Sequence, residues 1–237
     1  VRIFTYNMKR ESTKIKVMLS QKQFKFFKSR IGNSLEQIIT DFNSPELNIW
    51  VKSVSGKSKG FAGEIFEWVL TGEQGDNKAK PDFNGYEIKT ISFDELGKKA
   101  IEKMSLTAVS YSTIENETFK TSHVLDKSKI FVVKLTKNKN PLQRKFLGFG
   151  IIDLNLYFDQ VKKEYMYYRN LVCEGKANLF TSSAKVLGEN QILHVRTAGT
   201  RKYKEYTTKN GTPYSTKPYN FTLDYKVITR LIKPVLP

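Results

Sequence analysis

The spacing of apolar residues predicts four helices. In residues 61–72, FAGEIFEWVLTG, apolar side chains recur at i, i+4, i+7 and i+8, which predicts a core-packed helix that ends at Gly72. Residues 33–42, NSLEQIITDF, predict a short helix that is capped by its first Asn or Ser. The helical period also covers residues 156–175 and the segment 223–236 near the end of the chain.

Extended apolar segments lie between these helices. They predict five strands, at residues 85–93, 104–111, 128–136, 146–153 and 191–198. Strands clustered in the middle of the chain with helices on either side favour an α/β (α+β) fold, with a mixed central sheet flanked by helices. Residues 199–219 contain many basic residues and tyrosines, and we expect them to form a loop.

Length and composition favour one domain with embellishments. The chain has 237 residues, of which 39% are hydrophobic, enough for one substantial core. Forty Lys and Arg residues against 23 Asp and Glu give a formal charge of +17, which indicates a polyanionic partner. Nucleic acid and an anionic membrane surface are the main candidates. Because the sequence has no run of about 18 apolar residues and no secretory leader, we expect a cytoplasmic protein.

The first part of the chain is basic. Between positions 12 and 35 there are six basic residues and no acidic one, interleaved with three phenylalanines. We expect residues 1–33 to form a basic N-terminal extension and residues 34–237 to form the main domain. A solvated face of a short helix is favoured over an arm that contacts phosphates. The chain begins at Val1 without an initiator Met, which leaves open a longer parent chain with an additional domain.

Candidate metal ligands are limited by composition. One cysteine and two histidines cannot build an ordinary structural zinc site. Any metal therefore requires oxygen ligands, which points to a hard cation such as Mg²⁺.

Residues 80–91, KPDFNGYEIKTI, place charges in a short apolar strand. Side chains alternate along a strand, so Glu87 and Lys89 share one face, and Asp82 lies just before the strand. An exposed edge strand with an incidental ion pair is the structural alternative. Asp82 and Glu87 suit Mg²⁺, and Glu67 from the helix upstream would complete that site or start a second one. Lys89 would orient a metal-bound water or neutralise charge on a phosphate.

Five blocks of the sequence carry a family resemblance. Those at 59–72, 80–91, 93–111, 119–135 and 192–198 resemble, in this order, the MutH family of nicking and restriction endonucleases, which have the PD-(D/E)xK nuclease fold. The resemblance runs from about residue 34 to residue 231.

The resemblance implies roles for particular residues. The active site would consist of Glu67, Asp82, Glu87 and Lys89, with Lys127 as a further lysine that competes with nearby Lys129.

The family arginine that reads bases would be Arg196. Here Thr197 follows it where many members have proline, and Phe221 and Thr222 stand where an aromatic pair is expected. The spacing from Asp82 to Glu87 is shorter than in MutH itself.

The region around the late strand also has the composition of a DNA contact surface. Residues 194–219 hold six basic residues and four tyrosines against one acid, Glu205. Such groups suit phosphates and base edges, although a solvated loop has the same composition. We expect His123 and His194 to hold strand ends or contact DNA rather than to act as general bases. The expected DNA contacts are Arg196, Thr197, Arg201, Lys202, Lys204 and, from an upstream glycine-bracketed loop, Lys59.

The leading hypothesis is a Mg²⁺-dependent type II restriction endonuclease that hydrolyses phosphodiester bonds in double-stranded DNA, at GATC-like sites by resemblance. The enzyme would act as a homodimer on DNA or together with an additional domain of a parent chain. The alternatives are a DNA-binding module without catalysis and a mismatch-repair nicking endonuclease. No membrane partner is expected.

Overall fold

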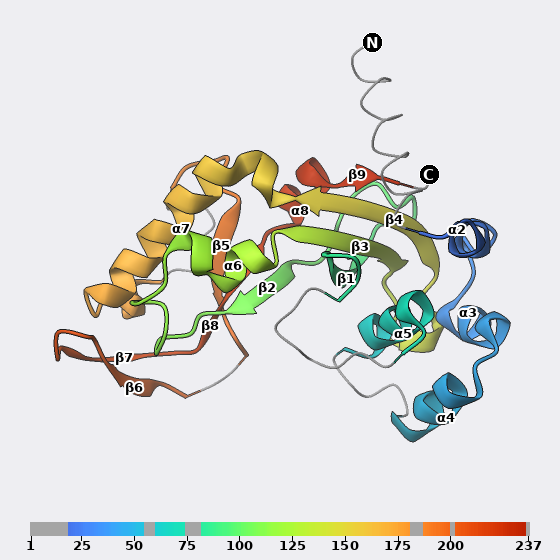
Figure 1. Cartoon of the computed structure of the whole chain (residues 1–237), viewed down its shortest axis with the longest axis horizontal. Coiled ribbons are helices and arrows are strands. Elements are labelled where there is room, and N and C mark those ends of the chain that lie inside the picture. The colour runs from blue at the N-terminus through green and yellow to red at the C-terminus, as the bar shows by residue number, and fades with distance from the viewer. Residues whose placement is uncertain (1–18, 55–59, 74–81, 181–186, 200–201, 236–237) are drawn as a thin grey trace, which may run out of the picture. The chain divides into compact units, whose positions relative to one another are not determined.

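The chain forms two compact units (Figure 1). The computed structural model describes residues 19–54, 60–73, 82–180, 187–199 and 202–235. The first unit comprises residues 1–102, 130–152 and 231–237, and the second comprises residues 103–129 and 153–230.

A four-stranded sheet forms the centre of the first unit. Its strand order is β1 (Glu87–Phe93), β3 (Lys129–Thr136), β4 (Phe146–Asp153) and β9 (Lys233–Pro234). Strand β1 runs parallel to β3, with Glu87 opposite Ile130, whereas β4 and β9 are antiparallel. The predicted mixed sheet is therefore confirmed.

Among the described residues, four α-helices accompany this sheet. They are α2 (Gln21–Lys28), α3 (Leu35–Phe42), α4 (Pro45–Val54) and α5 (Phe61–Thr71). Of the two capping residues expected for α3, Ser34 is the N-cap, and its hydroxyl accepts a hydrogen bond from the backbone N–H of Gln37. Helix α5 ends as predicted at Gly72, whose φ of 85° is readily adopted by glycine. Helix α4 was not predicted.

The core of the first unit is rich in phenylalanine. The ring of Phe27 in α2 lies 4.8 Å from that of Phe149 in β4 and 6.1 Å from that of Phe66 in α5. Phe27 is fully buried, while Lys28 beside it is exposed. The described part of the expected N-terminal extension thus contributes a helix to this core. Its boundary at residue 33 stays a prediction.

The second unit has a smaller antiparallel sheet. Its strand order is β2 (Met104–Ala108), β8 (Tyr219–Leu223) and β5 (Leu193–Thr197). Helix α7 (Phe158–Cys173) packs on this sheet through Tyr165 and Tyr168, whose rings lie 5.6 and 6.1 Å from that of Phe221. Short helices complete the chain: α6 (His123–Asp126), α8 (Tyr225–Leu231) and the 3-10 turns η1 (Phe119–Thr121), η2 (Pro141–Gln143), η3 (Leu154–Tyr157) and η4 (Ala177–Leu179).

Two predictions about the end of the chain are wrong. The expected loop at 199–219 contains a hairpin of β6 (Lys204–Thr207) and β7 (Pro213–Thr216), and β8 begins at its last residue. The expected helix 223–236 ends at Leu231, because the segment that contains Pro234 pairs with β4 as strand β9. Within the described residues, no helix has the length and apolar character needed to cross a membrane.

The first prediction concerns the phenylalanine core. Phe27→Ala should lower the free energy of unfolding by about 3 kcal/mol or more, because it leaves a cavity among packed rings. Lys28→Ala, at the next and exposed position, should change it by less than about 0.5 kcal/mol. Urea denaturation of the whole chain measures both, and equal effects would show that α2 is not part of this core.

Candidate active site

The candidate site lies where α5 packs against β1. Helix α5 buries Ile65, Phe66 and Trp68 in the core and leaves the Glu67 side chain partly exposed on its flank. Because the buried residues fix the rotation of the helix, Glu67 is held in one direction beside the strand.

A tight turn positions Asp82 in front of β1. The backbones of Phe83 and Tyr86 exchange two hydrogen bonds, of 3.0 and 2.8 Å, around Asn84 and Gly85. Both central residues have positive φ, 48° and 79°, as a two-residue hairpin turn of type I′ requires. The turn brings the carboxylate of Asp82 to within 2.9 Å of the backbone nitrogen of Ile88, measured from Oδ2. Because the chain turns back tightly here, the Asp82 carboxylate reaches the strand even though only four residues separate Asp82 from Glu87 in the sequence.

Glu87 and Lys89 lie on the same face of β1, as alternation predicts. Lys89 Nζ donates a hydrogen bond to Glu87 Oε1, which forms an ion pair. Glu87 is only 3% exposed, whereas the Lys89 side chain retains 28% of its accessible surface. A buried carboxylate is costly unless it is paired, and the ion pair with Lys89 offsets this cost.

The pKa of Glu67 shows that these groups act on one another. It is raised from 4.5 to about 7: burial is the largest cause, the negative charges of Asp82 and Glu87 add to it, and the positive charge of Lys89 opposes them. The other three side chains predicted for the active site are therefore within electrostatic reach of Glu67. Near neutral pH, Glu67 can hold or release a proton.

The chemistry of the donor set fits a hard divalent cation. Three carboxylates supply oxygen ligands, and their mutual repulsion would be relieved by a bound cation. In the described part of the chain, however, no three Asp, Glu, His or Cys side chains are grouped closely enough to form a ready metal site. The assignment of Glu67, Asp82 and Glu87 as Mg²⁺ ligands stays a prediction that rests on donor chemistry.

The two candidate lysines at the start of β3 belong to the second unit. Lys127 is the C-cap residue of α6 and is partly exposed. Lys129 is the exposed first residue of β3, immediately before the residue that pairs with Glu87. The role predicted for Lys127 stays a prediction.

The expected DNA contacts lie largely on the surface of the second unit. Arg196 and Thr197 are exposed at the end of β5, and Lys202 and Lys204 are exposed at the start of the hairpin. Arg201 and Lys59 lie outside the described residues. Of the four tyrosines in this region, Tyr206, Tyr214 and Tyr219 pack against other rings, whereas Tyr203 is 61% exposed beneath the ammonium group of Lys217.

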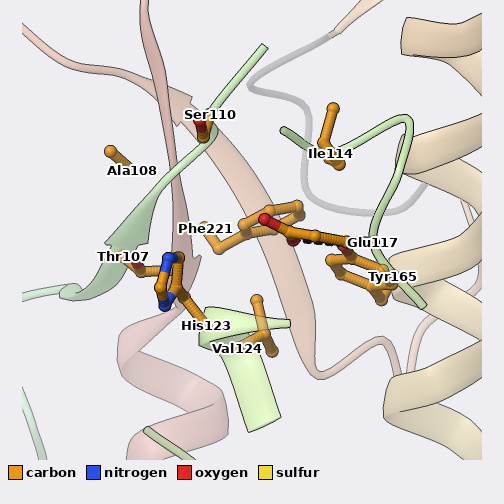
Figure 2. A pocket seen from close by; sticks show the side chains of 9 residues that line it. All are labelled: Thr107, Ala108, Ser110, Ile114, Glu117, His123, Val124, Tyr165 and Phe221. Atoms are coloured by element: carbon orange, nitrogen blue, oxygen red, sulfur yellow. Dashed lines mark hydrogen bonds between the residues drawn. The ribbon is translucent and has the colours of Figure 1, made fainter. Parts of the chain in front are cut away.

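The two histidines lie in different surroundings in the second unit, and the roles expected for them stay predictions. His194 is buried, and this burial lowers its pKa. Exposed His123 lines a pocket with a volume of about 10 Å³, room for one water molecule, beside Glu117 and Tyr165, which hydrogen bond to each other (Figure 2). The pocket is too small for a nucleotide.

The sequence predicts a turn at residues 83–85 between Asp82 and the strand, which is confirmed, and the structure adds the type of that turn. Its signal, Asn84-Gly85 before an alternating segment, is a strong short-range indication of a hairpin turn.

Comparisons with known proteins agree with this location. Residues 72–154 match the family model described as the DNA mismatch repair enzyme MutH, so the predicted resemblance is confirmed over this segment. The segment includes Asp82, Glu87, Lys89 and Lys127, whereas Glu67 and Arg196 lie outside it. With the mixed sheet of the first unit, this match is consistent with a restriction-endonuclease-like fold.

No curated protein matches the chain. Among solved structures, the chain is similar to the restriction endonuclease MvaI in a complex with its cognate DNA substrate, with 11% identity and a TM-score of 0.37. That similarity covers 81% of this chain and 99% of the other.

The second prediction concerns the charge of Glu67. Because its pKa is raised in the folded protein, its protonated form favours folding below pH 4.5, and this contribution is lost as the pH rises through about 7. Glu67→Gln removes the charge, so in EDTA it should raise the melting temperature relative to the parent chain at pH 8 but not at pH 5. Thermal denaturation at both pH values tests this, and an equal difference at the two would contradict it.

Proposed function

We propose that this protein is a Mg²⁺-dependent, sequence-specific DNA endonuclease of restriction type. The observation that carries the proposal is the arrangement of four side chains beside β1: Lys89 pairs with Glu87, Asp82 is held to the backbone N–H of Ile88, and Glu67 of α5 is near enough for their charges to affect its pKa. The MutH family match over residues 72–154 supports the assignment of this site to phosphodiester hydrolysis. The set corresponds to the PD-(D/E)xK pattern that the sequence indicates.

The residues of the site have complementary tasks. Asp82, Glu87 and Glu67 would hold Mg²⁺, which when bound supplies a Lewis acid and lowers the pKa of water. Lys89, anchored on Glu87, would orient the attacking water and neutralise charge that develops on the phosphate. The backbone N–H of Ile88 fixes the Asp82 carboxylate, which limits the reorganisation needed on binding.

The partner would be duplex DNA. The formal charge of +17 and the exposed cations Arg196, Lys202 and Lys204 support a polyanionic ligand. Recognition of a GATC-like site remains an expectation from the resemblance, as does a second copy of the chain on DNA for cleavage of both strands.

The family match also supports a second candidate function. It is described as a mismatch repair enzyme, so a nicking endonuclease that cuts one strand is the main alternative. A DNA-binding module without catalysis is a weaker one, because the four predicted catalytic positions are all filled by residues with suitable chemistry.

The third prediction tests the proposed reaction. The whole chain, incubated with long unmethylated duplex DNA and Mg²⁺, should produce discrete ends that share a short motif, and EDTA should abolish them. Asp82→Ala and Lys89→Ala should each lower the rate roughly a hundredfold or more while DNA binding is retained. Sequencing of the ends gives the site, and the number of cut strands separates restriction from nicking. Undiminished cleavage by both variants would rule out this site.

The fourth prediction concerns the DNA contacts. Each phosphate that the protein neutralises contributes about −0.9 to the slope of log K against log salt concentration. Lys202→Ala should therefore make the slope less steep by about one and weaken binding to all sequences alike. Fluorescence anisotropy at several salt concentrations measures this, and an unchanged slope would remove Lys202 from the contact surface.

A further inference from the structure

The β6–β7 hairpin has two different faces. Its register places Lys204 opposite Thr216, Glu205 opposite Ser215, Tyr206 opposite Tyr214 and Thr207 opposite Pro213. Directly opposed residues of an antiparallel pair share a face, and successive pairs alternate. One face, the inner face, therefore carries Lys204, Thr216, Tyr206 and Tyr214, and the other, the outer face, carries Glu205, Ser215, Thr207 and Pro213.

The inner face is docked on the rest of the second unit. The ring of Tyr206 lies 4.6 Å from that of Tyr111 and stacks 5.8 Å from that of Tyr214. Thr216 on the same face is fully buried. The hairpin is therefore held by packing in one orientation, and its outer face is preorganised.

The hairpin tip is fastened as well. The backbone nitrogen of Lys209 donates a 2.8 Å hydrogen bond to Glu115 Oε2, and its ammonium group lies 3.3 Å from Asn116 Oδ1. Gly175, just past the end of α7, lies against Thr208 and Thr212: a Cβ at this glycine would be 3.5 Å from a methyl group of each.

The outer face is exposed along its length and carries groups that can read bases. Glu205, Thr207, Pro213 and Ser215 are all exposed. Serine and threonine hydroxyls hydrogen bond with any base edge, and a glutamate carboxylate accepts from the amino group of cytosine. Glu205 is the single acid among residues 194–219, and within the described part of the chain it forms no ion pair that would account for it.

We propose that the β6–β7 hairpin enters the major groove of duplex DNA and that Glu205 determines specificity there by accepting a hydrogen bond from cytosine. A two-stranded ribbon fits the groove, which is about 12 Å wide in B-form DNA. Thr207 and Ser215 contact neighbouring base edges, and exposed Lys202 at the base of the ribbon contacts a phosphate. The deep, narrow major groove of duplex RNA does not admit such a ribbon.

The inference rests on the DNA partner of the proposed function, so the test separates binding from cleavage. The whole chain in EDTA selects duplexes from a random library, and the bound sequences are compared for the parent chain, Glu205→Ala, Glu205→Gln and the double variant Thr207→Ala/Ser215→Ala. Glu205→Ala should erase the preference for cytosine at one position and lower the ratio of specific to non-specific affinity about tenfold or more. Glu205→Gln should change the preferred base, since its amide can also donate.

Lys202→Ala is the matched control. It should weaken binding to all sequences without altering the preferred one. Near-UV circular dichroism of the tyrosines checks that each variant keeps the hairpin docked.

The outcomes are distinguishable from those of the proposed function. Unchanged sequence preference in the Glu205 variants overturns the inference, as does a parent chain that binds without preference, whether or not Mg²⁺ then supports cleavage. An altered preference in EDTA, with no cleavage in Mg²⁺ or Mn²⁺, upholds the role of the hairpin and overturns the endonuclease.

Discussion

The repulsion among three carboxylates on one face of α5 and β1 is the constraint around which the first unit is organised. Glu67, Asp82 and Glu87 are close enough that the charges of the other two raise the pKa of Glu67 beyond the effect of burial. Two local devices offset this cost. Lys89 pairs with Glu87, and the backbone N–H of Ile88 binds Asp82. These contacts offset part of the repulsion, and a bound divalent cation would relieve more of it.

Such an arrangement needs a rigid support. The face that opposes the charges is apolar: Ile88 of β1 and Phe66 of α5 belong to the core that also contains Phe27 and Phe149. Burial of these rings stabilises the folded state and offsets the destabilisation caused by the crowded carboxylates. Such a balance is expected where a charged site lowers the stability of a fold. Burial of the rings also explains why a helix from the basic start of the chain is embedded here, since Phe27 completes the aromatic cluster.

The sequence predicts these local features well and the longer-range ones poorly. Helix α5, strand β1 and the shared face of Glu87 and Lys89 follow from periods of 3.6 and 2, which depend only on near neighbours. The sequence predicts a loop where the β6–β7 hairpin lies, because the two strands are only four residues long and the segment is rich in lysine. Its Asn-Gly at 210–211, between alternating residues, is the signal that could have identified it. The raised pKa of Glu67 depends on how α5 packs on β1, which no spacing along the chain reveals.

The groups proposed for chemistry and for base reading make different demands on the chain. The carboxylates and Lys89 are packed among buried residues and interact with one another. A substitution at any of them therefore alters the charge interactions of the others inside the first unit. The outer face of the hairpin belongs to the second unit and buries none of its side chains, because the tyrosines of the inner face carry the packing. A substitution at Glu205 or Ser215 therefore loses little core burial, and surface changes of this kind cost little stability. Substitutions on the outer face of the hairpin can therefore change the preferred DNA sequence and leave the carboxylates that the proposed reaction requires in place.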